Sequence, residues 1–139
     1  MTPPIVDTGP LVAFLSADDS AHAWATAAFR QFDAPLFTCD VVIAEAHYLL
    51  SRTRNGADGL MALLETGGLQ LTPLAELDAA LLRQLIIRYR DMPMDLADAC
   101  IVRLSELHPE SAVVTLDRDF RVYRRNRRQS IPLICPPLK

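Results

Sequence analysis

Short apolar runs alternate with longer segments of helical periodicity along the whole chain. Short apolar runs between turn residues are typical of buried strands, and apolar positions three or four residues apart are typical of helices. This pattern predicts strands at residues 4–6, 36–39, 69–71, 112–116 and 131–135. Pro132 has no N–H to donate to a neighbouring strand, so the last strand is expected at the edge of its sheet.

The segments between the strands carry helical patterns. A turn at residues 7–10 leads into the apolar residues 11–15, and helices are predicted over residues 18–32, 40–52, 60–65, 76–89 and 95–107. The fourth of these helices has its apolar positions four residues apart, at Leu77, Leu81, Leu85 and Tyr89. Strands separated by helices indicate an α/β fold, with a parallel sheet of about five strands and helices on both faces.

Length and composition narrow the class of protein. A chain of 139 residues is the size of one domain, so a single domain is predicted over residues 1–139. Half of the residues are hydrophobic and 22% are charged, which excludes a disordered chain. No apolar run approaches the roughly 20 residues that span a bilayer, and no basic segment opens the chain, so no membrane association is expected.

The three cysteines are widely spaced and lie among apolar neighbours, at Cys39, Cys100 and Cys135. They form no Cys-x-x-Cys metal motif and no disulfide framework. We expect buried thiols in a reducing cytoplasm.

Two aspartates follow predicted strands directly. Asp7 ends the first strand and Asp117 ends the fourth, so both are expected at the same edge of the sheet, where α/β proteins bind ligands. Aspartates at strand ends also form turns and cap helices, and that structural role remains an alternative for each of them.

Glu45 lies in a helical segment whose apolar residues are Val41, Val42, Tyr48 and Leu49. Its spacing from both pairs places it on the face that these residues are expected to bury. A buried carboxylate costs several kcal/mol unless it is paired or bound to a cation. The alternative is a glutamate that leans out at the edge of the apolar stripe.

Asp95 and Asp98 open the last predicted helix and share one of its faces. Asp95 fits an N-cap with Asp98 as the capping-box partner. Capping does not explain why Asp98 lies beside the apolar residues and close to another negative charge. A cluster of carboxylates without cations either titrates or binds a metal, and oxygen ligands favour Mg²⁺ or Mn²⁺. His22, His47 and His108 lack metal-ligand spacing and are interpreted as structural or surface residues.

Four segments together resemble the conserved blocks of PIN-domain ribonucleases, and are similar to the VapC toxins of type II toxin–antitoxin systems. They are IVDTGPL at residues 5–11, VIAE at 42–45, DLADA at 95–99 and VTLDRDF at 114–120. The four blocks follow one another in the family's order and extend over most of the chain.

The resemblance implies a function and a set of site residues. It implies an Mg²⁺- or Mn²⁺-dependent endoribonuclease that leaves 5′-phosphate and 3′-hydroxyl ends, is neutralised by an antitoxin protein and forms a homodimer. Thr115 matches a hydroxyl that often supports the metal-bound water in this family, and Asp95 or Asp119 is a possible additional ligand. The family's acidic quartet corresponds to Asp7, Glu45, Asp98 and Asp117.

A basic segment follows the last acid of the quartet. Residues 118–128 carry a charge of +5 in a chain whose net charge is −3. Arginine forms bidentate bonds to phosphate, so this segment is a candidate for binding RNA. A solvated loop, or a site for acidic residues of a protein partner, is the alternative. The arginines concerned are Arg118, Arg121, Arg124, Arg125, Arg127 and Arg128.

Other classes of function fit the residues less well. A receiver-type signalling domain needs a partner lysine, and the only lysine is Lys139. A haloacid-dehalogenase-type phosphatase needs a second aspartate where Gly9 stands, and a dinucleotide-binding fold needs more glycines around Gly9 than the chain has. A catalytically silent PIN fold that only binds RNA or protein remains an alternative.

Overall fold

A computed structural model describes residues 2–33 and 35–137, and therefore leaves Lys139 outside the described residues. Its main sheet has five parallel strands in the order β3-β2-β1-β4-β7. The strands are β1 (Ile5–Val6), β2 (Leu36–Cys39), β3 (Leu69–Thr72), β4 (Val113–Val114) and β7 (Leu133–Ile134). The predicted parallel sheet is confirmed, and β7 lies at its edge, as Pro132 predicted.

Backbone hydrogen bonds extend the short central strands β1 and β4. The Asp7 N–H donates to the Val114 carbonyl at 3.0 Å, and the Thr115 N–H donates to the Ile134 carbonyl at 3.0 Å. The two residues that follow these strands are therefore fixed by the sheet itself. Their side chains lie at its carboxyl edge.

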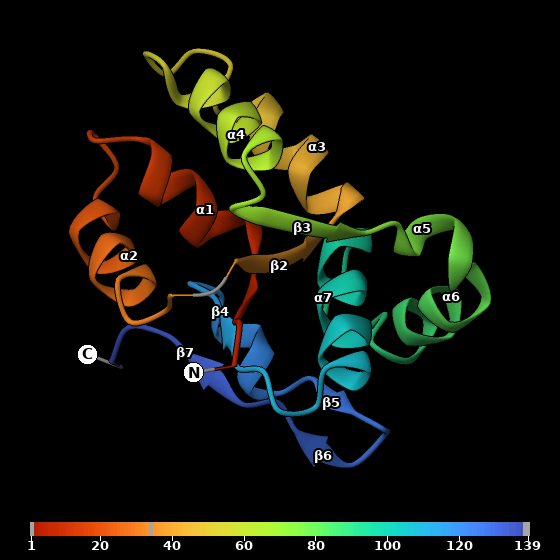
Figure 1. Cartoon of the computed structure of the whole chain (residues 1–139). Helices are drawn as coiled ribbons and strands as arrows, with labels where there is room; N and C mark the ends of the chain where they lie inside the picture. The colour runs from red at the N-terminus through yellow and green to blue at the C-terminus, as the bar shows by residue number, and fades with distance from the viewer. Residues whose placement is uncertain (1, 34, 138–139) are drawn as a thin grey trace.

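Helices lie on both sides of the sheet, with α1 and α2 on one side and α6 and α7 on the other (Figure 1). Helix α7 packs against β1 and β2, and most of its residues from Ala97 to Ser105 are buried. The helices are α1 (Thr8–Leu15), α2 (His22–Phe29), α3 (Asp40–Leu49), α4 (Gly56–Glu65), α5 (Leu74–Leu77), α6 (Ala79–Arg88) and α7 (Leu96–Leu107), with a 3-10 turn η1 (Arg118–Arg121).

Several helix predictions are corrected by the structure. Helix α1 begins directly after β1, where a turn was predicted, because the Asp7 carboxylate accepts the Thr8 N–H at 2.8 Å. Helix α2 begins later than the predicted acidic caps, although the Asp19 carboxylate accepts the Ala21 N–H at 2.9 Å. Phe32 lies beyond the end of α2, and α4 begins at Gly56, before the predicted start.

The segment predicted as one helix over residues 76–89 forms two helices that meet at Asp78. The Asp78 carboxylate accepts a bond from Arg103 of α7 at 2.8 Å, which holds the break in place. The predicted apolar stripe is wrong at its beginning, because Leu77 and Leu81 are exposed while Leu82 and Leu85 are buried. The helical periodicity starts again after Asp78, so α6 turns the face with Leu82 and Leu85 towards the core.

A second, two-stranded sheet was not predicted. Strands β5 (Arg124–Arg125) and β6 (Gln129–Ser130) form an antiparallel hairpin within the basic segment. The polar sequence of this segment carries no alternation of apolar and polar residues, which is the usual signal of a strand. The strands of this hairpin lie beside the end of α7, away from the main sheet (Figure 1).

The cysteines and histidines are mostly where the sequence predicted. Cys39 and Cys100 are buried free thiols, whereas Cys135 is only half-buried. His22 bonds to the Ala13 carbonyl, and the ring of His108 packs against that of Phe37. Nowhere in residues 2–33 and 35–137 does a helix combine the length and the apolar character that crossing a bilayer requires.

Candidate metal-binding acidic site

Asp7 is held at the carboxyl end of β1 by bonds to both of its carboxylate oxygens. Oδ1 accepts the Thr8 N–H at 2.8 Å, and Oδ2 accepts the Thr115 hydroxyl at 2.8 Å. The side chain is buried, and this burial raises the pKa of Asp7 to about 6, with the nearby charges of Asp117 and Glu45 adding to the rise. Asp7 therefore has a fixed orientation and a weakened preference for its charged form.

Thr115 links Asp7 to Asp117 through its buried hydroxyl. The hydroxyl donates to Asp7, while its oxygen accepts the Asp117 N–H at 3.0 Å. Asp117 in turn caps η1, because its carboxylate accepts the Asp119 N–H at 2.9 Å. Two strand ends are thus joined by one chain of hydrogen bonds.

Asp95 and Asp98 form a capping box at the start of α7. The Asp98 N–H donates to the Asp95 carboxylate at 2.8 Å, and the Asp95 N–H donates to the Asp98 carboxylate at 3.2 Å. Burial, together with the nearby charges of Asp95, Asp7 and Asp117, raises the pKa of Asp98 to about 8. Capping therefore accounts for the local geometry, but the charge of Asp98 remains unfavourable.

Glu45 reaches the same site for a different reason than the sequence suggested. The buried face of α3 consists of Val42, Ala46 and Leu50, and Glu45 is exposed. Tyr48 and Leu49, which were expected to be buried, are also exposed. The prediction of a buried Glu45 is wrong, because the buried stripe of Val42, Ala46 and the C-cap residue Leu50 shares only Val42 with the expected one.

The predicted quartet nevertheless converges on one cavity of about 360 Å³ at the carboxyl edge of the sheet. Asp95 also lines this cavity, whereas Asp119 does not. No ion pair involves any of the lining acids in the part of the chain that the structure describes. The lining residues are Asp7, Thr8, Gly9, Glu45, Leu49, Asp95, Asp98, Leu116 and Asp117.

The donor chemistry of this cavity fits a hard divalent cation, since all of its charged groups are carboxylates. Within residues 2–33 and 35–137, however, no three acidic, histidine or cysteine side chains are placed to hold one ion together. Several carboxylate oxygens are bonded instead to backbone N–H groups, at Thr8, Asp98 and Asp119. Binding of an ion by three of these acids therefore requires some of the carboxylates to change position around the site.

Four lining residues were not predicted from the sequence. Thr8 and Gly9 form the first turn of α1, directly after Asp7, while Leu49 follows Tyr48 in α3 and Leu116 lies between Thr115 and Asp117. Their position beside or near predicted acids was the available signal. A Cβ at Gly9 would lie 3.3 Å from the Leu116 side chain, so the cavity wall is tightly packed there.

The basic segment divides into two separate regions. Arg118 and Arg121 line a second hollow of about 340 Å³, which shares Leu116 and Asp117 with the acidic cavity. The Arg121 guanidinium bonds to the Cys135 sulfur at 3.2 Å. These two arginines therefore lie next to the acids.

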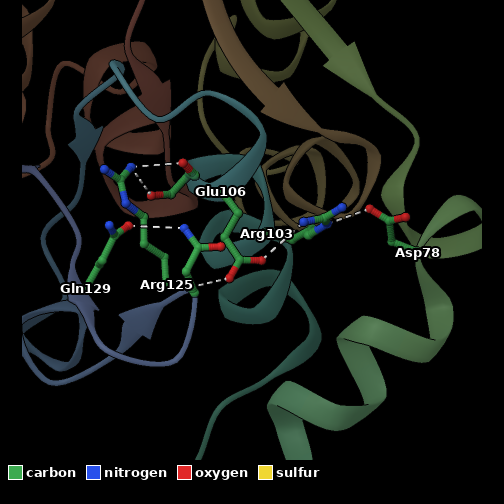
Figure 2. Close-up of polar contacts among 7 residues, drawn as sticks. Asp78, Arg103, Glu106, Arg125 and Gln129 are labelled. Carbon is green, nitrogen blue, oxygen red and sulfur yellow. Dashed lines mark hydrogen bonds and ion pairs between the residues drawn. The ribbon is translucent and has the colours of Figure 1, made fainter.

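The remaining arginines belong to the hairpin at the other end of α7. The Arg125 guanidinium is buried and donates to the Ser105 carbonyl at 2.9 Å and the Pro109 carbonyl at 3.0 Å, as Figure 2 shows in part. Arg124 donates to the carbonyls of the three residues that precede it. Both terminal nitrogens of Arg125 donate within the protein, so this residue is not presented to RNA or a partner as the sequence suggested. Arg127 and Arg128 remain exposed.

Parallel α/β sheets bind their ligands at the carboxyl edge, and an acidic cavity at that edge can hold the metal ions that many nucleases use. The model of the PIN domain family matches residues 5–126, and the chain belongs to this family. This membership removes the receiver and phosphatase alternatives.

Two comparisons give individual relatives. The chain is 31% identical over 117 residues to Ribonuclease VapC26 of Mycobacterium tuberculosis, a match that covers 82% of this chain and 86% of that protein. Its fold is similar to the crystal structure of Mycobacterium tuberculosis VapC20, described as a sarcin-ricin loop cleaving toxin, with a TM-score of 0.76 and 18% identity. That match covers 85% of this chain and 92% of the other.

Proposed function

We propose that the chain is an endoribonuclease that depends on Mg²⁺ or Mn²⁺. The observation that carries this proposal is the convergence of five unpaired carboxylates, from four separate segments, on one cavity of the described structure. Such an arrangement destabilises the metal-free protein, as the raised pKa values of Asp7 and Asp98 indicate. A divalent cation removes that repulsion. The relationship to a protein named as a ribonuclease supports RNA as the substrate.

The residues of the quartet have distinct tasks in this proposal. Asp7, Asp98, Glu45 and Asp117 would hold the metal, which would supply Lewis-acid chemistry for activating water and for offsetting charge on the phosphoryl oxygens. Thr115 and the Thr8 N–H fix both oxygens of Asp7, so this ligand is preorganised. Asp117 would accept a proton from the attacking water. Asp95 lines the cavity and is a possible additional ligand, but Asp119 does not line it.

Arg118 and Arg121 supply the cationic part of the substrate site. Their hollow adjoins the acidic cavity through Leu116 and Asp117. A phosphate one or two nucleotides from the cleaved bond would lie within reach of these guanidinium groups while the scissile phosphate lies at the acids. This placement explains how an acidic site accepts a polyanion.

Cleavage of single-stranded RNA tests the proposal. Purified protein should produce 5′-phosphate ends with Mg²⁺ or Mn²⁺ and should stop when EDTA is added. Undiminished cleavage in excess chelator would contradict the metal mechanism. A protein that binds RNA with unchanged affinity in metal and in EDTA, and never cleaves it, would instead be a catalytically silent PIN module.

We also propose that the chain is the toxin of a toxin–antitoxin pair, acting in the cytoplasm. Its relationship to VapC proteins supports this role. An apolar groove of about 420 Å³ between α5, α6 and the start of α7 offers a surface for a protein partner. Expression of the chain should arrest growth, and co-expression of the antitoxin, the product of a neighbouring short gene, should restore it. Light scattering of the purified chain tests the expected homodimer.

A further inference from the structure

Helix α3 exposes an aromatic side chain beside the acidic cavity. Tyr48 is 77% exposed and Leu49 is 52% exposed, whereas the opposite face of the helix is fully buried. The hydroxyl and the ring of Tyr48 have no hydrogen-bond or aromatic partner among the described residues, and the bonds at this residue involve its backbone, such as that from the Ser51 hydroxyl to its carbonyl. Folding of the chain therefore makes little use of this ring.

Tyr48 shares a helix face with two residues that line the cavity. Glu45 is three residues before it and Leu49 is the next residue, and both line the acidic cavity. Residues three and four apart on a helix are neighbours on its surface, so Glu45, Tyr48 and Leu49 form one triangle. Tyr48 therefore belongs to the exposed face of α3 that borders the cavity, although it is not itself a lining residue. Arg118 and Arg121 line the hollow that adjoins the cavity through Leu116 and Asp117.

The chemistry of this face favours a nucleobase. The proposed metal would hold the cleaved phosphate at the acids, but Glu45 on this face of α3 repels the other phosphates of the strand. An uncharged aromatic contact is therefore more favourable here than a further contact with the RNA backbone. Arg52 and Arg54 follow α3 in the chain and are exposed, which gives the ring basic neighbours in sequence. Exposed aromatic rings close to arginines are typical of surfaces that bind single-stranded nucleic acid.

We propose that the Tyr48 ring stacks on a base of the RNA substrate next to the cleaved phosphodiester. This inference rests on the proposed ribonuclease function and adds a positioning residue to it. Because every base has an aromatic face, the contact positions the strand for cleavage without selecting one sequence.

Binding to abasic RNA tests the stacking directly. Affinity is measured by fluorescence anisotropy with Asp117→Asn in every protein, to block cleavage, and with a series of oligonucleotides that each lack one base. Removing the stacked base should weaken binding of the protein with Tyr48 by about 5- to 100-fold. Tyr48→Ala should show the same loss on intact RNA and should be insensitive to that abasic position. Tyr48→Phe should bind like the protein with Tyr48.

Leu107→Ala is the matched control, because Leu107 is an exposed apolar residue at the opposite end of α7 and should leave RNA binding unchanged. Equal RNA affinity for Tyr48→Ala and the protein with Tyr48 would overturn the inference. So would a loss that is the same for intact and abasic RNA, or a change of oligomeric state with RNA affinity intact, which would assign the ring to a protein interface. If the unmodified protein cleaves no RNA, the proposed function itself has failed.

Discussion

The two ends of helix α7 carry charged residues in opposite circumstances. At its C-terminal end, Arg103 is paired with Asp78 and Glu106 (Figure 2). The terminal nitrogens of the buried Arg125 donate to the Ser105 and Pro109 carbonyls. At its N-terminal end, Asp95 and Asp98 lie beside further carboxylates and have no cation partner among the described residues. The helix has 12 residues, so about 18 Å separates the two ends.

The charged residues at one end of α7 therefore contribute to stability, whereas those at the other end indicate a functional site. Opposite charges that satisfy one another fix the hairpin and α6 against α7, and the fold gains from them. Like charges gathered in one cavity cost the fold free energy, so their retention points to a ligand. The sequence shows charged residues at both ends of α7. Only the three-dimensional structure shows that those at one end are paired and those at the other are not.

The largest expected effect is the loss of cleavage when an acid of the cavity is neutralised. Asp7→Asn and Asp98→Asn should each lower kcat/KM for RNA by about 100-fold or more, because a ligand of the metal and its charge are removed. The metal-free stability of both variants should stay constant or rise, since repulsion is relieved, and the thermal stabilisation by added metal should disappear.

Asp119→Asn is the control for these variants, because Asp119 follows the same strand as Asp117 but does not line the cavity. It should retain near-normal activity and metal stabilisation. Full activity of Asp7→Asn together with normal stabilisation by metal would show that Asp7 is only a helix cap.

The sequence predicted the sheet and the convergence of the acids because both follow from local rules. Strand ends at Asp7 and Asp117 must meet at one edge when the strands are parallel and adjacent. The capping box at Asp95 was likewise readable from spacing.

What the sequence did not predict depends on which face each helix turns inward. Glu45 was assigned to a buried stripe that included Tyr48, but α3 buries a neighbouring stripe and leaves both exposed. The arginines looked like one patch because they are close together in the chain. The hairpin turns Arg125 into the end of α7, while Arg118 stays beside the acids, and such a division depends on tertiary contacts.

The second largest expected effect is a loss of stability when the charged contacts at the C-terminal end of α7 are removed. Arg125→Ala should lower the free energy of unfolding by about 1–3 kcal/mol, because the carbonyl acceptors at Ser105 and Pro109 lose their donor. Arg128→Ala, an exposed change in the same hairpin, should stay within about 0.5 kcal/mol. Denaturant unfolding measures both. Equal stability of the two variants would mean that the hairpin contributes no more than a solvated loop.

A smaller effect is expected in the salt dependence of RNA affinity, which should differ between the arginines beside the acids and those of the hairpin. Each phosphate contact contributes about −0.7 to the slope of log affinity against log salt for single-stranded RNA. Replacing Arg118 and Arg121 together with Ala should flatten this slope by about 1.4, if each contacts one phosphate. The Arg127→Ala, Arg128→Ala double variant removes the same charge from the far end and should flatten it less. The reverse order would place the RNA along the hairpin.

The smallest expected effect is a pH dependence of stability in the metal-free protein, which comes from the acidic end alone. The folded-state pKa of Asp98 is raised from 3.8 to about 8 and that of Asp7 to about 6, so the folded chain holds protons that the unfolded chain has released. Stability is then full below about pH 4 and falls as pH rises towards 8. In EDTA, Tm should fall by a few degrees between pH 5 and 8.

The chain also contains three histidines, a residue type that ordinarily titrates in this range, so the comparison with Asp98→Asn isolates the carboxylate. The amide that this substitution introduces retains an oxygen for the Asp95 N–H but does not titrate. The variant should therefore show a flatter curve that meets the wild-type curve near pH 4 and lies above it near pH 8. Saturating Mg²⁺ should flatten the wild-type curve in the same way, because the metal stabilises the charged carboxylates. Parallel curves for the two metal-free proteins would show that Asp98 ionises as easily in the fold as in the unfolded chain, and the two ends of α7 would then differ less than the structure indicates.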